Sequence, residues 1–234
     1  MKKKRNKMIL WIFLAPCLIL LSFSIFLFGD MPISSEPPDW SDGLNFLGLF
    51  FVSLSLYFIY IQAETQNIRD ELNRINALLD EISSLIETIQ YSSKTGTDAI
   101  ILFAKEYVVG GTPHPRVVID KIQYSICLIR VCLSDLTKIN DRTETLRIAQ
   151  KACLLFYTHL YFTITSLDKE GKCLLVKLEP QYNQFKDQFT DLQKISYYLL
   201  RKWNLVGPHH ESENFLSLRG EEFGELKDVY RYFN

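Results

Sequence analysis

The feature that most limits what this chain can fold into is a pair of long apolar runs near its start. Met8 to Phe28 holds 21 residues without an acidic or basic side chain, and Leu44 to Ile61 is a slightly shorter run of the same kind. At about 1.5 Å per residue, a helix of about 20 residues crosses the roughly 30 Å hydrocarbon core of a bilayer. Trp40, Tyr57 and Tyr60 lie where an aromatic belt is expected. We therefore expect transmembrane helices over residues 8–28 and 44–61.

The charges outside these runs predict how the pair crosses the membrane. Residues 1–7 carry five basic side chains, whereas the loop 29–43 carries four acids and no Lys or Arg. Because basic segments stay on the cytoplasmic side, we expect an external acidic loop and both termini in the cytoplasm. A cleavable signal peptide is the alternative for 8–28, although no clear cleavage site follows it. Cleavage would leave the second span with its N-terminus outside, and the soluble domain would be cytoplasmic in either case.

The second run is expected to continue as an amphipathic heptad helix over residues 62–92. No glycine or proline occurs between Gly48 and Gly96, and the polar stretch is rich in good helix formers. Its branched apolar residues alternate in steps of four and three, and we call this set the seam: Ile68, Leu72, Ile75, Leu79, Ile82, Ile86 and Ile89.

Two interpretations of the seam stay open. It packs on the helices that follow as part of one core, which the additional Leu78 and Leu85 favour because they widen the apolar stripe. In the other interpretation it pairs between copies as a parallel coiled coil, which would make the protein a homo-oligomer.

The remaining sequence predicts a cytoplasmic helical bundle over residues 93–206 and a polar tail over 207–234. Helical periodicity covers 98–109, 117–139, 142–167 and 180–203, with Asn140 and Asp141 as caps, whereas Lys172 to Leu178 is too short to separate strand from helix. In the tail, Glu221 to Tyr232 is a short helix that docks or stays mobile. The residues expected to face the core are Ile122, Ile126, Ile129, Leu133, Leu136, Leu146, Ala149, Cys153, Phe156, Leu160, Tyr182, Phe185, Phe189, Leu192 and Leu199.

The predicted fold class is therefore all-α. An N-terminal two-helix transmembrane hairpin continues through a long amphipathic or coiled-coil helix into a cytoplasmic helical bundle.

Motifs for catalysis, cofactors or metals are not apparent in the sequence. It lacks the phosphate-loop pattern Gly-x-x-x-x-Gly-Lys-[Ser/Thr] and the nucleophile elbow Gly-x-Ser-x-Gly, and its five cysteines form no Cys-x-x-Cys pair. Outside the basic start and the acidic loop, 21 basic and 23 acidic residues leave the chain near neutral, so direct nucleic-acid binding is not expected. We expect a non-enzymatic protein without catalytic, cofactor-binding or metal residues.

A resemblance adds a function to this architecture. The second run and its continuation read FLGLFFVSLSLYFIYIQAETQNIRDELNRI. Together with the hairpin and its acidic loop, they resemble the N-terminal half of bacterial abortive-infection membrane proteins and the two-span effector subunit of antiviral retrons. The likeness covers roughly residues 8 to 90 and carries over no site residues.

The resemblance implies a membrane effector of anti-phage defence that causes abortive infection by disrupting the bilayer. A cytosolic protein or ribonucleoprotein, in a retron the reverse transcriptase with its RNA–DNA product, would hold the effector in check until infection. Two other classes fit the same residues. One is a non-enzymatic membrane scaffold or adaptor, and the other is an accessory subunit of a transporter.

Overall fold

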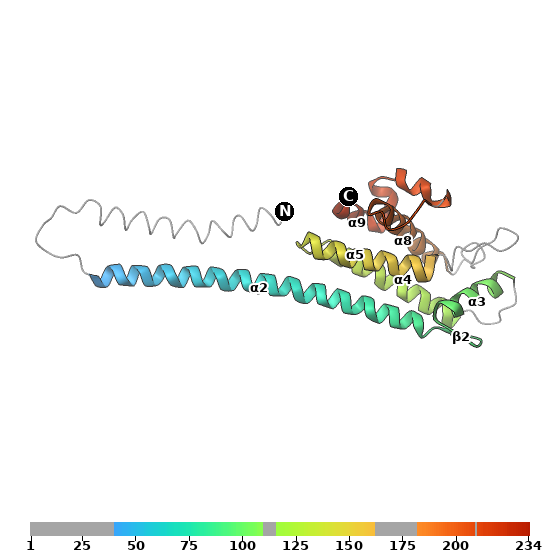
Figure 1. The fold of residues 1–234 in the computed structure, drawn as a ribbon, viewed down its shortest axis with the longest axis horizontal. Helices are drawn as coiled ribbons and strands as arrows, with labels where there is room; N and C mark the ends of the chain where they lie inside the picture. Colours follow the sequence, from blue (N-terminus) through green and yellow to red (C-terminus); the bar gives the residue numbers. More distant parts are fainter. Residues whose placement is uncertain (1–39, 110–115, 162–181, 209) are drawn as a thin grey trace, which may run out of the picture. The chain divides into compact units, whose positions relative to one another are not determined.

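The computed structural model describes residues 40–109, 116–161, 182–208 and 210–234 (Figure 1). Helices account for 86% of these residues, and the strands are limited to one two-stranded hairpin, so the predicted helical class is confirmed for this part of the chain. The predicted first transmembrane helix, most of the external loop and the ambiguous segment from Lys172 to Leu178 lie outside the described residues.

Helix α2 (Trp40–Glu87) joins the second apolar run to the amphipathic extension in one uninterrupted helix of 48 residues. The stretch that begins at Gly48 is long and apolar enough, in length and composition, to cross a membrane. Two hydroxyl groups inside it have partners on the same helix. The hydroxyls of Ser55 and Thr65 donate to carbonyls four residues earlier, at 2.7 and 2.8 Å.

The chain divides into two units, Met1–Arg69 and Asp70–Asn234. In the first unit, seven large apolar side chains of α2 are between 41% and 61% exposed. These side chains are Leu49, Phe51, Val52, Leu56, Phe58, Ile59 and Ile61. Such a continuous apolar surface is unfavourable in water and is favourable against lipid or another apolar surface.

In the second unit, α2 ends at Glu87, five residues before the predicted end of the amphipathic helix. A short antiparallel hairpin follows, formed by β1 (Gln90–Tyr91) and β2 (Lys94–Thr95). The N–H of Gly96 donates to the carbonyl of Ile89 at 2.8 Å and closes the hairpin, and the positive φ of Gly96 (61°) turns the chain into α3 (Gly96–Val109). The helix therefore stops without a glycine or proline at its end.

The core of the second unit is built from α4 (Arg116–Leu136), α5 (Arg142–Phe156) and α8 (Asn183–Lys202), which contact one another pairwise (Figure 1). A π-helical turn, η1 (Tyr157–Tyr161), extends α5. Asp141 caps α5 as predicted, since its carboxylate accepts from the N–H groups of Thr143 and Glu144.

The predicted core faces of α4 and α8 are confirmed, because all their listed residues are buried. In α5 the prediction fails at Leu146, which is only half-buried. The other predicted residues of this face are buried, namely Ala149, Cys153, Phe156 and Leu160. Ile148 and Ala152 are buried as well, so the core face of α5 is confirmed except at Leu146 and is wider than predicted.

The last part of the chain docks on this core. It comprises the 3₁₀ helices η3 (His210–Ser217) and η4 (Gly220–Leu226), followed by α9 (Lys227–Phe233). η4 contacts α8, and α9 contacts both α4 and α8. Of the two alternatives for the predicted tail helix, the structure therefore favours docking.

Candidate functional site

The seam lies in the second half of α2 and, except for its first residue, belongs to the core of the second unit. Leu72 is 6% exposed, and the five residues that follow it in the seam are at most 1% exposed. Ile68 is only half-buried, as are Leu78 and Leu85 beside the seam. A coiled coil between copies would need these side chains to be accessible. Burial within a single chain therefore favours internal packing over the coiled-coil interpretation.

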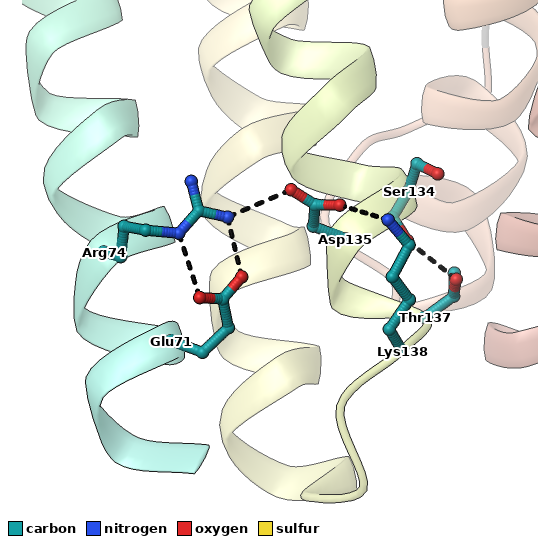
Figure 2. A network of polar contacts seen from close by, with 6 residues as sticks. All are labelled: Glu71, Arg74, Ser134, Asp135, Thr137 and Lys138. Carbon is teal, nitrogen blue, oxygen red and sulfur yellow. Dashed lines mark hydrogen bonds and ion pairs between the residues drawn. The ribbon is translucent and has the colours of Figure 1, made fainter. Parts of the chain in front are cut away.

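A polar network fastens the start of this seam to α4 (Figure 2). We call Glu71, Arg74, Asp135 and Lys138 the clamp. The Arg74 guanidinium donates to both carboxylate oxygens of Glu71, from Nη2 at 2.6 Å and from Nε at 2.9 Å. Its Nη2 also donates to Oδ2 of Asp135 on α4 at 3.1 Å, while the Lys138 Nζ donates to Oδ1 of Asp135 at 2.6 Å. Arg74 thus bridges two helices, and Asp135 receives two cations.

The clamp shifts the pKa values of Glu71, Arg74 and Asp135 in the direction that keeps these three side chains charged. Hydrogen bonds to Glu71 and then Asp135 raise the pKa of Arg74, and the hydrogen bond from Arg74 lowers the pKa of Glu71. Burial alone would raise the pKa of Asp135, but the hydrogen bonds from Lys138 and Arg74 outweigh it and hold this pKa below its ordinary value. Asp135 is the most buried member, at 18% exposure.

Two lysines make further contacts along α2. The Lys151 Nζ on α5 donates to Asn76 Oδ1 at 2.8 Å and to Asp80 Oδ1 at 2.7 Å. Near the other end of the seam, the Lys121 Nζ on α4 donates to the carbonyl of Thr88 at 3.4 Å. The second half of α2 is therefore held by apolar packing on one face and by polar contacts to α4 and α5 at the margins of that face.

Sequence reasoning found the seam but missed the clamp. The signal was present as two acid–base pairs at a spacing of three residues, Glu71 with Arg74 and Asp135 with Lys138. That spacing identifies each pair on its own helix. It does not reveal that the pairs meet across 61 residues of sequence, which depends on how α2 and α4 pack.

Apolar packing, hydrogen bonds and ion pairs hold the second half of α2 against α4 and α5. Within the described ranges, no three His, Cys, Asp or Glu residues gather closely enough to hold a metal ion. Comparisons with protein-family models, with curated proteins and with solved structures give no match. The geometry of α2 and its surroundings is therefore the basis for a function.

Proposed function

We propose that this protein is a membrane effector of bacterial anti-phage defence, in which the helical bundle restrains a transmembrane hairpin until infection. The observation that supports this proposal is the division of α2 into an exposed apolar part and a buried part. One continuous helix carries an exposed apolar surface over its first part and a buried seam over its second. A helix of this kind would connect a packed bundle to a bilayer, so that a movement of the bundle moves the segment in the membrane.

Transmission follows from the stiffness of a helix. Backbone hydrogen bonds link each turn to the next, so a rotation or shift of the seam also moves the apolar part of α2. The seam and the clamp resist such a shift in the resting state. A cytosolic partner that binds the two arrangements of the bundle with different affinity would move the equilibrium between them.

The proposed setting is the bacterial inner membrane, with two spans and both termini in the cytoplasm. The partner would be a cytosolic protein or ribonucleoprotein, such as a reverse transcriptase with its RNA–DNA product. Release would let hairpins of several copies associate and permeabilise the bilayer. Since the span from Leu44 to Ile61 has no ionisable side chain except tyrosine, we expect general leakage rather than selective conduction.

Dye entry during infection tests this proposal. Cells carrying the complete system are challenged with phage, and uptake of a membrane-impermeant DNA dye is followed together with survival of the culture. We expect dye entry in every culture that is protected. Protected cells with intact membranes would contradict the effector function.

A membrane adaptor is the second candidate, and one observation favours it. Val117, Tyr124 and Val131 on α4 are 67%, 55% and 43% exposed, and their seven-residue spacing places them on one helical face. Such a stripe is typical of a surface that recruits another protein. Exchanging residues 1–61 for an unrelated two-span anchor separates the candidates, because an adaptor keeps its activity in the exchanged protein and an effector loses it.

A further inference from the structure

Residues Arg219–Asn234, which follow the bundle, form a segment that we call the strap. It consists of η4 and α9, and its side chains at five positions are buried against the bundle: Phe223, Leu226, Val229, Tyr230 and Phe233. The rings of Phe223 and Tyr230 stack with centroids 4.6 Å apart, and both contact Tyr198 of α8, at 5.5 and 5.2 Å. The strap therefore covers an aromatic surface of α8.

A buried arginine ties the strap to α4. The Arg130 side chain is 9% exposed, and its guanidinium pairs with the carboxylate of Glu225 in the strap. Among the described residues, Glu225 is the carboxylate that pairs with Arg130, and the Arg130 Nε has no hydrogen-bond partner. A buried guanidinium is costly when its counter-charge leaves.

The two partners differ in what release would cost them. Glu225 is 79% exposed, so its carboxylate is already largely hydrated and would lose little by moving into water. The arginine would stay in the bundle without its ion-pair partner, and the carboxylate of Asp191 on α8 would be the acid left to interact with its charge. Detachment of the strap would therefore cost free energy mainly at Arg130, because this residue is the buried member of the pair.

A second fastening lies beside the first. The backbone N–H of Glu225 donates to the Asp191 carboxylate on α8, and burial raises the pKa of that carboxyl. Gly224 adopts φ 57° and ψ −129°, and a Cβ at this position would overlap the Asp191 carboxylate. The strap therefore meets α8 in a conformation that glycine alone adopts without strain.

The strap also holds itself together. Within it, the Glu221 carboxylate pairs with Lys227 at 2.9 Å and with Arg231 at 2.6 Å. These bonds join η4 to α9 without using any residue of the bundle. At its far end the Tyr232 hydroxyl donates to the carbonyl of Ile139 at 2.7 Å, and the Lys202 Nζ donates to the carbonyl oxygens of Asn234 and Phe233 at 2.8 and 3.3 Å. Further hydrogen bonds to the bundle join the Tyr232 hydroxyl to Thr145 at 3.2 Å, the Tyr198 hydroxyl to Asn234 Oδ1 at 2.7 Å, and the Lys194 Nζ to the carbonyl of Glu222 at 3.3 Å.

We propose that the strap is a releasable cover of the bundle, held by the Arg130–Glu225 pair and able to detach as one unit while α4, α5 and α8 stay folded. Detachment uncovers the aromatic surface around Tyr198. The inference concerns the second unit alone and does not depend on the proposed membrane function.

Hydrogen exchange of the full-length protein in detergent micelles, read by mass spectrometry, tests the cover. Glu225→Gln removes the counter-charge of Arg130, and we expect exchange in peptides covering 220–233 to rise at least tenfold while α5 keeps its protection. Glu221→Gln is the matched control, since its cationic partners lie inside the strap, and it should change exchange there less than twofold. Unchanged exchange in Glu225→Gln, an equal effect in Glu221→Gln, or equal acceleration of α5 would overturn the proposal.

The same substitution made in a second variant protein distinguishes loss of the ion pair from a general loss of packing. Arg130→Met removes the buried charge while keeping an apolar side chain of similar length, so the strap no longer depends on Glu225. In this background we expect Glu225→Gln to change strap exchange less than twofold. The same tenfold rise in both backgrounds would show that Glu225 acts without Arg130, and the proposal would fail.

Discussion

Asp135 shows how a single residue can link two helices that are distant in sequence. It is the least exposed member of the clamp and receives hydrogen bonds from Arg74 on α2 and from Lys138 one turn farther along the chain. The other members are 41% to 70% exposed, so water screens much of their attraction. The clamp is therefore expected to set the register of α2 on α4 more than to stabilise the bundle strongly.

Replacing Arg74, which bridges α2 and α4, tests how much the clamp stabilises the bundle. We expect Arg74→Met to destabilise the bundle by about 1 kcal/mol, which lowers Tm by roughly 2–4 °C in a domain of this size. Thermal unfolding followed by circular dichroism in detergent measures it. Arg147→Met is the matched control, because Arg147 pairs with Glu144 on its own helix and is 73% exposed. Equal shifts in the two variants would contradict a bridging role for Arg74.

The clamp also predicts a dependence on pH. The pKa values of Glu71 and Asp135 are lowered from 4.5 and 3.8, so these carboxyls bind fewer protons in the folded than in the unfolded protein. Their stabilising contribution is therefore complete above the unfolded values and is lost as the pH falls through the folded ones. We expect the Tm difference between the wild type and Arg74→Met to shrink from pH 6 to pH 3. A difference that stays constant would show that the two carboxylates do not supply it.

At the scale of the element, α2 shows which parts of a helix are readable from sequence. Apolar spacing located the seam, and the absence of glycine and proline indicated a continuous helix. The stop at Glu87 was missed because it depends on hydrogen bonds of the following hairpin rather than on a breaking residue. The apolar spacing could not predict what the seam packs against, since the same spacing fits an internal core and a coiled coil.

Truncation within the seam separates buried from flanking positions on the same helix. Leu79 is fully buried, so we expect Leu79→Ala to cost about 2–5 kcal/mol, whereas half-buried Leu78→Ala should cost about 1 kcal/mol or less. Unfolding in detergent compares the two variants. Costs of similar size would contradict the packing described for α2.

The mass of the detergent-solubilised protein adds an independent check on the seam. Internal packing predicts that Ile75→Asp and Ile82→Asp loosen the bundle without changing the number of chains in the particle, because neither side chain is accessible to a second copy. Multi-angle light scattering gives that number. Dissociation of an oligomer in these variants would restore the coiled-coil interpretation.

At the scale of the whole molecule, one helix belongs to two environments. From Gly48 to Ile61 most of its large apolar side chains are exposed, and from Leu72 onward its apolar face is covered by the chain itself. Hydropathy identified the first part because a long apolar run is a property of composition, which the sequence states directly. The clamp and the strap belong to the second environment. They depend on which side chains come into contact after folding, and such contacts cannot be predicted from composition.

The proposed function requires that α2 crosses the membrane. Labelling with a membrane-impermeant maleimide tests this directly. Single cysteines are placed at Ser41→Cys and at Ser84→Cys, on either side of the apolar part of α2, after the five native cysteines have been replaced. Ser84 is exposed in the bundle, so its accessibility reports the side of the membrane. We predict labelling of the cysteine at 41 in intact cells and of the cysteine at 84 only after the inner membrane is permeabilised. Equal labelling of both positions in intact cells, or protection of both, would contradict a membrane-spanning α2.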